Sequence, residues 1–381
     1  MKAMAGYPTT LLKRWKSRIN ATRVNAAGVR LKDKILVIES DDWGAIRTPS
    51  MEVLRKFEAA GMDLSSSIYR HDALASEQDL DLLFNVLQDV RNSDGEAVKV
   101  TGNSIMANPD FDKIRQDNFE RYHFEPFTTT LEKYPQHGKS FAKWQQAMMS
   151  DIFRPQFHGR EHLNIKRWMK RLQSGDDKVR FCFDQRTTFS GAGDYSFMEA
   201  FDWDHRDDIA THREIIADGL DMFEKTLGFR SKSFIAPCYN WDPALDAEFS
   251  KMGIDMLQST RRQLVPTGLF DQYTDKIHFF GERQSGCPRY NVRNCFFEPT
   301  MNPAKDWVDS CLAEIGTAFA FHKPAVICSH RVNYIGFIEE KNRDRGLREL
   351  SRLMKAVVKK WPEVKFMFTD QLADQMAKND G

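Results

Sequence analysis

Short apolar runs alternate along the chain with longer segments of helical periodicity. Residues 35–38 (ILVI), 97–101 (AVKVT) and 325–328 (AVIC) are short and rich in β-branched residues, whereas residues 77–91 and 345–360 repeat apolar side chains at helical spacing. Continuous apolar runs are typical of strands buried on both faces of a parallel sheet. Such strands, alternating with helices, predict an α/β fold built as a parallel sheet or a βα-barrel.

The same patterns extend this prediction over the rest of the chain. Further strands are expected at residues 155–157, 179–183, 232–236, 255–258, 276–280 and 364–368. Further helices are expected at residues 51–60, 163–172, 207–227, 243–252 and 303–318, with Ser76 as N-cap of the 77–91 helix and Gly228 as C-cap of the 207–227 helix. No repeat or long linker divides the chain, which predicts a single domain of residues 1–381. Residues 1–30 form a basic lead-in, and residues 110–152 form an insertion whose aromatic side chains we expect to fill the core.

Polar clusters follow four of the predicted strands, at residues 40–43, 158–162, 237–241 and 329–331. In a βα-barrel the carboxyl ends of the strands meet on one face, which is the usual place of catalysis. Asp41 and Asp42 stand directly after the first buried strand, and carboxylates are rarely buried without a partner. We therefore expect a functional site at this face, with a solvated turn as the alternative interpretation of the acidic pair.

Composition narrows the classes of partner. The chain has 55 Lys and Arg against 54 Asp and Glu, so its net charge of +1 gives no case for nucleic acid or an anionic membrane as the main partner. The first 30 residues contain no apolar run suited to export or to a membrane span. The six cysteines form no CxxC pair, which predicts reduced thiols and a cytoplasmic location. The sequence does not predict an oligomeric state.

Histidines and a carboxylate offer a possible metal site. His158 and His162 are four residues apart, and together with Asp42 they would form a His-His-Asp ligand set with positions left open for water. We expect one divalent ion, with zinc favoured and cobalt, nickel or iron as alternatives. His330 follows an apolar strand and suits a general acid, since the pKa of histidine lies near neutrality. A pair of surface or core histidines is the alternative to the metal site.

These motifs resemble those of the polysaccharide deacetylases, the carbohydrate esterases that share the chitooligosaccharide deacetylase homology domain. The family's first motif ends in Asp-Asp, as residues 40–42 do, and its second motif is His-x-x-x-His, as in residues 158–162. Its third motif ends a strand with Ala-Pro-aromatic, which residues 234–237 resemble, and its last is an apolar strand that ends in His, as residues 326–330 do. The motifs occur in the family's order, between residues 34 and 373.

The resemblance implies a fold, a reaction and a role for each motif residue. The implied fold is a distorted (β/α)7 barrel, here with a helical insertion. The implied activity is metal-dependent removal of an acetyl group, with N-acetyl favoured, from a carbohydrate. By the same resemblance Asp41 is the catalytic base, Asp42, His158 and His162 bind the metal, commonly zinc, and His330 is the acid that protonates the leaving amine.

The chain also departs from the family's pattern. The first motif usually reads Thr-Phe-Asp-Asp-Gly, whereas residues 39–43 read Glu-Ser-Asp-Asp-Trp. The third motif usually holds an Arg that orients the base, and Ile235 takes its place here. We expect another arginine to approach Asp41, with Arg331 favoured and Arg293 as the alternative. The family's Asp-rich fourth motif has no evident counterpart, and Glu39 within residues 39–43 is the next candidate base.

Several residues near the strand ends are candidates to contact a substrate. These candidates are Trp43, Pro237, Tyr239 and Trp241, and the three aromatic ones offer stacking faces for a sugar. The 186–206 loop and the 110–152 insertion are the expected walls of the cleft. We expect a pocket for a small soluble or membrane-linked intermediate in preference to an open groove for a long polymer.

Two other functions fit parts of the same sequence. Residues 158–162 (HGREH) match the H-x-x-E-H pattern of inverzincin metallopeptidases, in which Glu161 is the base and Glu214 or Glu224 the third ligand. That interpretation leaves the Asp pair unexplained. A deacetylase-like protein that binds glycans without turnover is the other alternative, and the missing motif arginine favours it.

Overall fold

The computed structural model describes residues 21–64, 67–191 and 196–378. Its strands are β1 Ile35–Trp43, β2 Val100–Ser104, β3 Ala107–Pro109, β4 Phe124–Pro126, β5 Phe153–Phe157, β6 Ser233–Ile235, β7 Met256–Ser259, β8 Arg262–Pro266, β9 Tyr273–Ile277, β10 Arg289–Val292, β11 Cys295–Phe296, β12 Ala325–His330 and β13 Lys365–Phe366.

The α-helices are α2 Met51–Ala59, α3 Glu77–Asp89, α4 Phe111–Gln116, α5 Phe127–Glu132, α6 Ser140–Met149, α7 Ile165–Gln173, α8 Asp177–Asp184, α9 Asp208–Leu227, α10 Asp246–Lys251, α11 Trp307–Ala320, α12 Glu340–Lys360 and α13 Thr369–Lys378. Short 3₁₀ helices are η1 Ile68–Arg70, η2 Pro237–Tyr239, η3 Pro243–Leu245 and η4 Arg331–Tyr334.

A parallel sheet forms the centre of the molecule. Its strand order is β10-β7-β6-β5-β2-β1-β12-β11, and β13 pairs with β1 in addition. The two ends of this order, β10 and β11, are consecutive pieces of one stretch of chain. At their junction the Arg293 N–H bonds to Ser259 O at 2.8 Å, and the Asn294 N–H bonds to Val326 O at 3.2 Å. The stretch therefore passes from the β7 side to the β12 side and closes the sheet into a distorted barrel.

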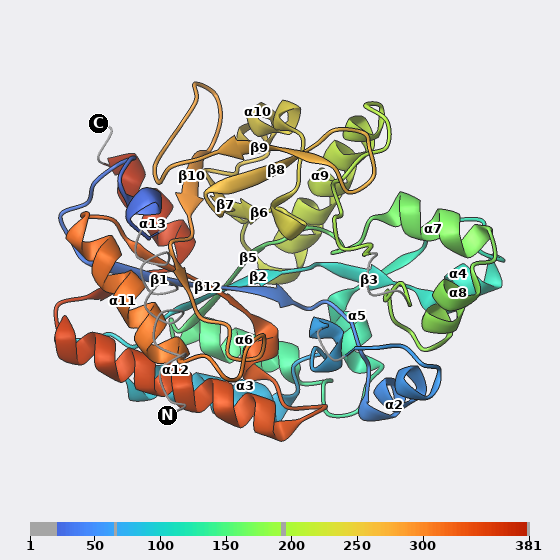
Figure 1. Cartoon of the computed structure of the whole chain (residues 1–381), viewed down its shortest axis with the longest axis horizontal. Helices are drawn as coiled ribbons and strands as arrows, with labels where there is room; N and C mark the ends of the chain where they lie inside the picture. The colour runs from blue at the N-terminus through green and yellow to red at the C-terminus, as the bar shows by residue number, and fades with distance from the viewer. Residues whose placement is uncertain (1–20, 65–66, 192–195, 379–381) are drawn as a thin grey trace, which may run out of the picture.

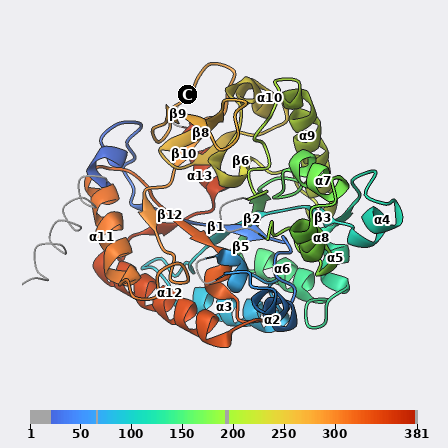
Figure 2. The same ribbon diagram turned by 45° about the vertical axis from the view of Figure 1, so that its right-hand side comes forward.

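Helices cover the outside of this barrel (Figure 1). Figure 2 shows α3, α11 and α12 together on one side of the strands, with α9 and α10 on another. All nine residues of β1 are buried, because the strand lies between β2 and β12 with side chains packed against both of its faces. This burial matches the apolar run at residues 35–38 and explains why the polar residues that follow it need partners.

Local sequence signals set several element ends as expected. Ser76 caps α3 and forms a capping box with Asp79, whose side chain accepts from the Ser76 N–H at 3.0 Å. Helix α9 ends at Gly228, which adopts the left-handed conformation with φ +80°. Both predictions are confirmed. The α/β fold with a parallel sheet is confirmed as well.

Two predicted strands are wrong in type or place. Residues 179–183 form part of helix α8, and their buried positions Val179, Cys182 and Phe183 follow helical spacing. Asp176 caps this helix by accepting from the backbone N–H of Lys178 and Val179. The strand expected at 276–280 is β9, which ends at Ile277 and pairs antiparallel with β8 outside the central sheet.

Residues 110–152 contain α4, β4, α5 and α6, and β4 pairs antiparallel with β3. Their large aromatic side chains pack inward: Phe127 and Trp144 stack with ring centroids 5.1 Å apart, and Trp144 also contacts Phe153 of β5. Of the predicted 1–30 lead-in, residues 1–20 lie outside the described residues, and residues 21–25 are helical. No helix in the described part of the chain is long and apolar enough to cross a membrane.

Candidate active site

The ends of β1 and β12 bring the two predicted acid–base residues together. The parallel register pairs Asp41 of β1 with His330 of β12, and His330 Nε2 lies 3.8 Å from Asp41 Oδ2. The next residue, Asp42, has a left-handed backbone with φ 73°, and the pairing of β1 with β2 shifts register between Ser40 and Trp43. This bulge interrupts the alternation of side chains along β1, so the side chains of the adjacent residues Asp41 and Asp42 both contribute to the site at this end of the barrel.

Asp42, His158 and His162 form a cluster that can hold a metal ion, with ligand atoms within 4.8 Å of one another. His158 Nε2 and His162 Nε2 lie 3.5 and 3.4 Å from Asp42 Oδ1. His158 follows β5, while His162 lies in the loop before α7, so the two histidines converge from a loop and do not share a helix face. All three side chains are less than a tenth exposed.

The hydrogen bonds and charges around the triad fit a metal ligand set. Nδ1 of His158 lies 2.8 Å from Ile235 O, and because a carbonyl only accepts, Nδ1 donates this hydrogen bond and leaves Nε2 as the nitrogen that faces Asp42. Burial lowers the pKa of His162 well below its usual range, and Arg47 lowers it further, so this imidazole is neutral as a ligand must be. Burial alone would raise the pKa of Asp42, but the Arg47 guanidinium above all holds it well below its usual range.

Asp42 is the first member of a buried series of ion pairs that alternate in charge. Arg47 donates to Asp42 Oδ1 at 3.0 Å and pairs through Nε with Asp72 Oδ2 at 3.0 Å. Arg331 donates from Nη2 to Asp72 Oδ1 at 2.6 Å and from Nη1 to Ala45 O at 2.8 Å. The expectation that Arg331 approaches Asp41 is therefore wrong, because its guanidinium is committed to Asp72.

Arg293 is the arginine that reaches Asp41. It donates from Nη1 to Asp41 Oδ2 at 2.6 Å and from Nη2 to Asp41 Oδ1 at 2.7 Å, while Asn103 donates to the same Oδ1 at 2.7 Å. Burial would raise the pKa of Asp41, but the Arg293 guanidinium reverses this and holds the pKa below its usual range. The carboxylate is thus ionised and held in one orientation by three hydrogen bonds.

Glu39 shares Arg293 with Asp41. Arg293 Nε donates to Glu39 Oε2 at 2.7 Å, and Asn291 and Thr369 donate to Glu39 Oε1 at 2.7 and 2.8 Å. Burial raises the pKa of Glu39 above its usual range although Arg293 opposes the effect. Both oxygens of Glu39 are occupied, so its observed contacts are those of a buried partner that fixes Arg293.

Sequence reasoning missed Glu298, the partner of His330. Glu298 Oε1 lies 2.6 Å from His330 Nδ1, and Glu298 Oε2 accepts from Asn333 Nδ2 at 2.7 Å. Burial would lower the pKa of His330, but Glu298 and Asp41 raise it well above its usual range. Glu298 lies in the loop after β11, and no strand or motif in the sequence marks that position; only its contact with β12 identifies it.

The candidate substrate contacts separate into two groups. Tyr239 is partly exposed, and its hydroxyl accepts from Arg293 Nη1 at 3.0 Å, while Pro237 is buried at the start of the same 3₁₀ turn. Trp43 and Trp241 are 0% and 1% exposed and pack in the main hydrophobic core. The expectation that these two tryptophans offer stacking faces is therefore wrong.

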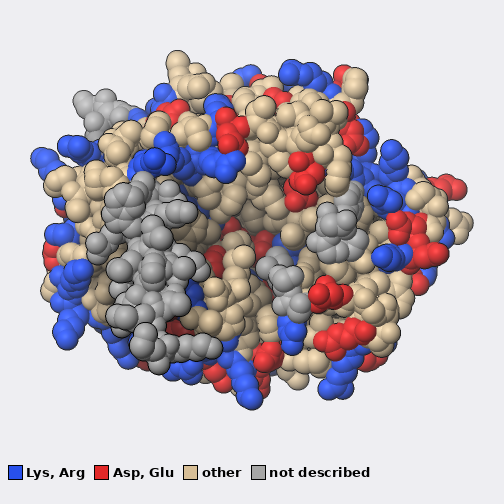
Figure 3. Space-filling view, in the orientation of Figure 1, with Lys and Arg blue, Asp and Glu red and all other residues tan. Residues whose placement is uncertain are grey.

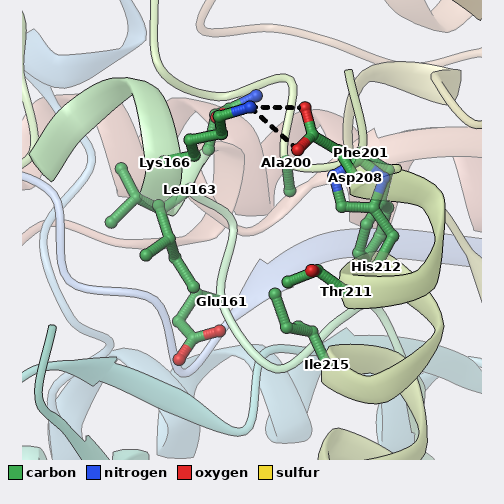
Figure 4. Close-up of a pocket in the computed structure, with 11 residues that line it drawn as sticks. Glu161, Leu163, Lys166, Ala200, Phe201, Asp208, Thr211, His212 and Ile215 are labelled. Carbon is green, nitrogen blue, oxygen red and sulfur yellow. Dashed lines mark hydrogen bonds and ion pairs between the residues drawn. The ribbon is translucent and has the colours of Figure 1, made fainter. Parts of the chain in front are cut away.

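The contacts of Glu161 do not match those of a metallopeptidase base. Both of its carboxylate oxygens accept from Arg160 Nε, at 2.8 and 2.9 Å, and burial raises its pKa to about 7 against the opposing effect of Arg160. Figure 4 shows Glu161 at the wall of a cavity of about 200 Å³, across from the helix that carries His212 and Ile215. The cavity lies beside α9 and is lined by none of the triad residues. The cluster that joins His158 and His162 contains Asp42 and neither Glu214 nor Glu224, so the geometry favours Asp42 as the third ligand.

The surface carries charges of both signs. On the face seen in Figure 3, Lys and Arg are interspersed with Asp and Glu, and a hollow near the centre of this face shows acidic atoms. The mixed pattern agrees with the near-zero net charge and gives no extended basic patch on the visible face. Of the 186–206 loop expected to wall the cleft, residues 192–195 lie outside the described residues, and Met198 Sδ lies 2.8 Å from Arg47 Nη1.

The chain matches no protein-family profile and no curated protein. Among solved structures, it is similar to a putative polysaccharide deacetylase from Mycobacterium smegmatis, at 13% identity and a TM-score of 0.42, over 93% of this chain and 94% of that one. It is also similar to a CE4 family pseudoenzyme from Bacillus anthracis (8% identity, TM-score 0.37, 90% of this chain and 66% of that one). The 4-alpha-glucanotransferase from Thermococcus litoralis matches at 10% identity and a TM-score of 0.45 over 90% of this chain, which spans 40% of that protein's length. The structural neighbours of the chain thus include a putative polysaccharide deacetylase, a CE4 family pseudoenzyme and a glucanotransferase, all at low identity.

Proposed function

We propose that the protein is a metal-dependent hydrolase that removes an acetyl group, with N-acetyl favoured, from a carbohydrate. The observation that carries the proposal is the pairing of Asp41 with His330 beside the Asp42–His158–His162 cluster. The ligand set would suit zinc, with cobalt, nickel or iron as alternatives. When bound, the ion would supply Lewis acidity that polarises the acetyl carbonyl and makes water a stronger nucleophile.

Asp41 is the proposed general base. Its carboxylate would take a proton from the attacking water as the new C–O bond forms at the acetyl carbon. Arg293 and Asn103 support this role because their hydrogen bonds fix the plane of the carboxylate, which lowers the reorganisation needed in the reaction. The lowered pKa of Asp41 keeps the base ionised at neutral pH.

His330 is the proposed general acid. Its Nε2 lies on the Asp41 side, and from there the imidazolium would give a proton to the leaving nitrogen as the C–N bond breaks. Glu298 holds the opposite nitrogen, Nδ1, and raises the pKa of His330, so that the acid remains protonated above the usual range of histidine. Opposite pKa shifts on neighbouring groups are the usual mark of a base and an acid at one site. The products would be acetate and a free amine.

The substrate is proposed to be small. The proposed substrate is a biosynthetic intermediate, such as an acetylated amino sugar in soluble or membrane-linked form, and the partly exposed Tyr239 is the proposed contact for it. A reducing, cytoplasmic setting is part of the proposal, and the cysteines support it because Cys182, Cys238, Cys287, Cys295, Cys311 and Cys328 are all unpaired.

A second candidate function is glycan binding without turnover. It is favoured by one observation: Asp41 Oδ1 accepts two hydrogen bonds and Oδ2 accepts one, from donors that include a guanidinium. A carboxylate bound this tightly is a weaker base than a free one. The binding candidate predicts saturable association with acetylated saccharides and no release of acetate.

One experiment separates the two candidates. Purified protein is analysed for bound metal and then incubated with short acetylated saccharides, sugar nucleotides, insoluble chitin and peptidoglycan, while acetate release is measured. The proposal expects a divalent ion at the Asp42–His158–His162 cluster and acetate release from small substrates, which Asp41→Asn should lower by roughly 10²–10⁴-fold. Turnover of the insoluble polymers alone would overturn the proposed substrate, and binding of saccharides without any acetate would favour the second candidate.

A further inference from the structure

Three potential metal ligands lie together behind His330, separate from the triad. Glu298, Cys328 and His330 place one ligand atom each within 4.8 Å of one another. Glu298 and Cys328 are 4% and 3% exposed, whereas the His330 side chain is 31% exposed, so the cluster is reached from solvent through His330. None of these residues belongs to the Asp42–His158–His162 cluster.

An imidazole nitrogen and a thiol sulfur both face one carboxylate oxygen in this cluster. His330 Nδ1 lies 2.6 Å from Glu298 Oε1, and Cys328 Sγ donates to the same Oε1 at 3.9 Å. The other oxygen of Glu298 accepts from Asn333 Nδ2 at 2.7 Å, which fixes the carboxylate and keeps Oε1 turned toward the imidazole and the thiol. A carboxylate oxygen that accepts hydrogen bonds from a histidine and from a cysteine marks a place where a cation can displace both of these protons and bind all three side chains.

We propose that Glu298, Cys328 and His330 form a second binding site, for a thiophilic divalent cation such as zinc, cobalt or cadmium. The exchange is balanced in charge and in atoms. Before binding, the carboxylate carries one negative charge, the imidazolium one positive charge, and the thiol none. On binding, the divalent ion enters, the thiol and the imidazolium each release one proton to solvent, and bonds form to Oε1, Sγ and Nδ1. The buried cluster is neutral before and after the exchange, so the ion adds no net charge to the interior.

The spacings of Glu298 Oε1 from the other two ligand atoms are near those of a tetrahedral site. Tetrahedral zinc with bonds of about 2.0–2.3 Å separates its ligand atoms by roughly 3.3–3.8 Å. The Cys328 Sγ to Glu298 Oε1 distance of 3.9 Å is already close to that range, while the His330 to Glu298 distance of 2.6 Å must open as the hydrogen bond gives way to the ion. His330 can move outward because part of its side chain faces solvent.

The charges around the cluster do not oppose a cation. Arg293 lies nearby, with Nη1 3.4 Å from Cys328 Sγ, but its charge is already paired with Glu39 and Asp41. Burial raises the pKa of the Cys328 thiol, and the same guanidinium opposes that effect because Nη1 donates toward Sγ, which helps a metal ion to displace the thiol proton. Cysteine sulfur, imidazole nitrogen and a carboxylate oxygen together form a ligand set that zinc and cobalt accept.

Occupancy of this site would affect the proposed reaction. An ion on His330 Nδ1 replaces the Nδ1 proton, so His330 is no longer an imidazolium and gives up its Nε2 proton less readily; a second equivalent of metal would therefore inhibit acetate release. That consequence rests on the proposed function. The binding itself does not, because it is measured without any substrate.

The test is a cobalt titration of metal-free protein, followed by optical absorption. Cobalt bound to a thiolate shows a charge-transfer band in the near ultraviolet, which identifies a cysteine ligand directly. We expect wild-type protein to bind two equivalents and to show the thiolate band. His162→Ala should bind one equivalent and keep the band, whereas Cys328→Ser should bind one equivalent and lose it. Cys287→Ser, in a buried cysteine outside the cluster, is the matched control and should behave as wild type.

Each result supports or overturns the site. A single equivalent in wild-type protein with no thiolate band would overturn the inference, and so would a band that persists in Cys328→Ser. If Cys328→Ser does not fold, as judged by circular dichroism, Glu298→Gln replaces it and should lose the second equivalent. Normal acetate release by a protein that never shows the band would remove this site and leave the proposed function intact. A protein that shows the band but releases no acetate from any substrate would keep this site and remove the proposed function.

Discussion

Arg293 donates a hydrogen bond to each carboxylate oxygen of Asp41, at 2.6 and 2.7 Å, across 252 residues of sequence. It also donates to Glu39 at 2.7 Å, so one guanidinium serves two buried carboxylates of the same strand. Arg293 occupies the junction between β10 and β11, where the barrel closes. The orientation of the proposed base is therefore tied to the closure of the sheet.

Replacing Arg293 should damage both stability and activity. Arg293→Met leaves Asp41 and Glu39 buried without their shared counter-charge, and breaking a buried pair in this way costs roughly 3–5 kcal/mol of unfolding free energy. Urea unfolding measures the loss, and acetate release should fall as well. The matched control is Arg262→Met, since Arg262 pairs with Asp275 on the surface with its side chain 63% exposed, and such pairs contribute about 0–1 kcal/mol. Equal effects of the two substitutions would contradict the role given to Arg293.

Loss of one imidazole should release the metal and spare the fold. In His162→Ala the cluster keeps only Asp42 and His158, which is too few ligands for tight binding of a divalent ion. Metal analysis after dialysis should show a large loss at the triad, while circular dichroism remains that of the wild type. His205→Ala, in an exposed histidine with 72% side-chain exposure, is the control and should retain the metal. Full occupancy of the triad in His162→Ala would rule out His162 as a ligand.

Asp41→Asn should separate metal binding from turnover. The amide keeps the size of the carboxylate but cannot accept the proton, so acetate release should fall by roughly 10²–10⁴-fold. Metal content should stay at the wild-type level because Asp42, His158 and His162 remain. An Asp41→Asn protein that retains its rate would shift attention to another base, and Glu39→Gln would then be measured beside it.

Glu298 should set the alkaline limit of activity. It raises the pKa of His330, and the protonated form of His330 is the proposed acid, so activity should extend to pH values above the usual histidine range. In Glu298→Gln the pKa of His330 falls, and the alkaline limb of the kcat/KM profile should move to lower pH. Glu298→Asp keeps the charge and should restore part of the shift. An unchanged alkaline limb in Glu298→Gln would contradict the assignment.

The same pair predicts how stability depends on pH. Because the pKa of His330 is higher in the folded protein than the unfolded value of about 6.5, the stabilisation is complete below that pH. It is lost as the pH rises from about 6.5 through the raised folded pKa. Urea unfolding at a series of pH values should show this decline in wild-type protein and a smaller decline in His330→Gln. A decline of the same size in both proteins would show that it comes from other groups.

The sequence alone determined the features that depend on local pattern. The apolar run at 35–38, the helical spacing at 345–360 and the caps at Ser76 and Gly228 each act over a few residues, so periodicity and turn chemistry were enough to predict them. The triad could also be predicted from the sequence, because Asp42 and His158 come soon after predicted strands and His162 is four residues beyond His158. In a parallel barrel the ends of such strands converge wherever the chain between them runs.

Only the tertiary structure decided which distant side chains meet. Arg331 was the favoured partner of Asp41 because it adjoins His330, but the chain turns into η4 after β12 and carries its guanidinium to Asp72. Arg293 and Glu298 reach the site because residues 289–296 close the barrel beside β12, and that closure leaves no local pattern. Trp43 and Trp241 are buried in the core, which the sequence did not predict. The burial of a side chain depends on residues from elsewhere in the chain that pack against it, and the spacing of its sequence neighbours does not reveal them.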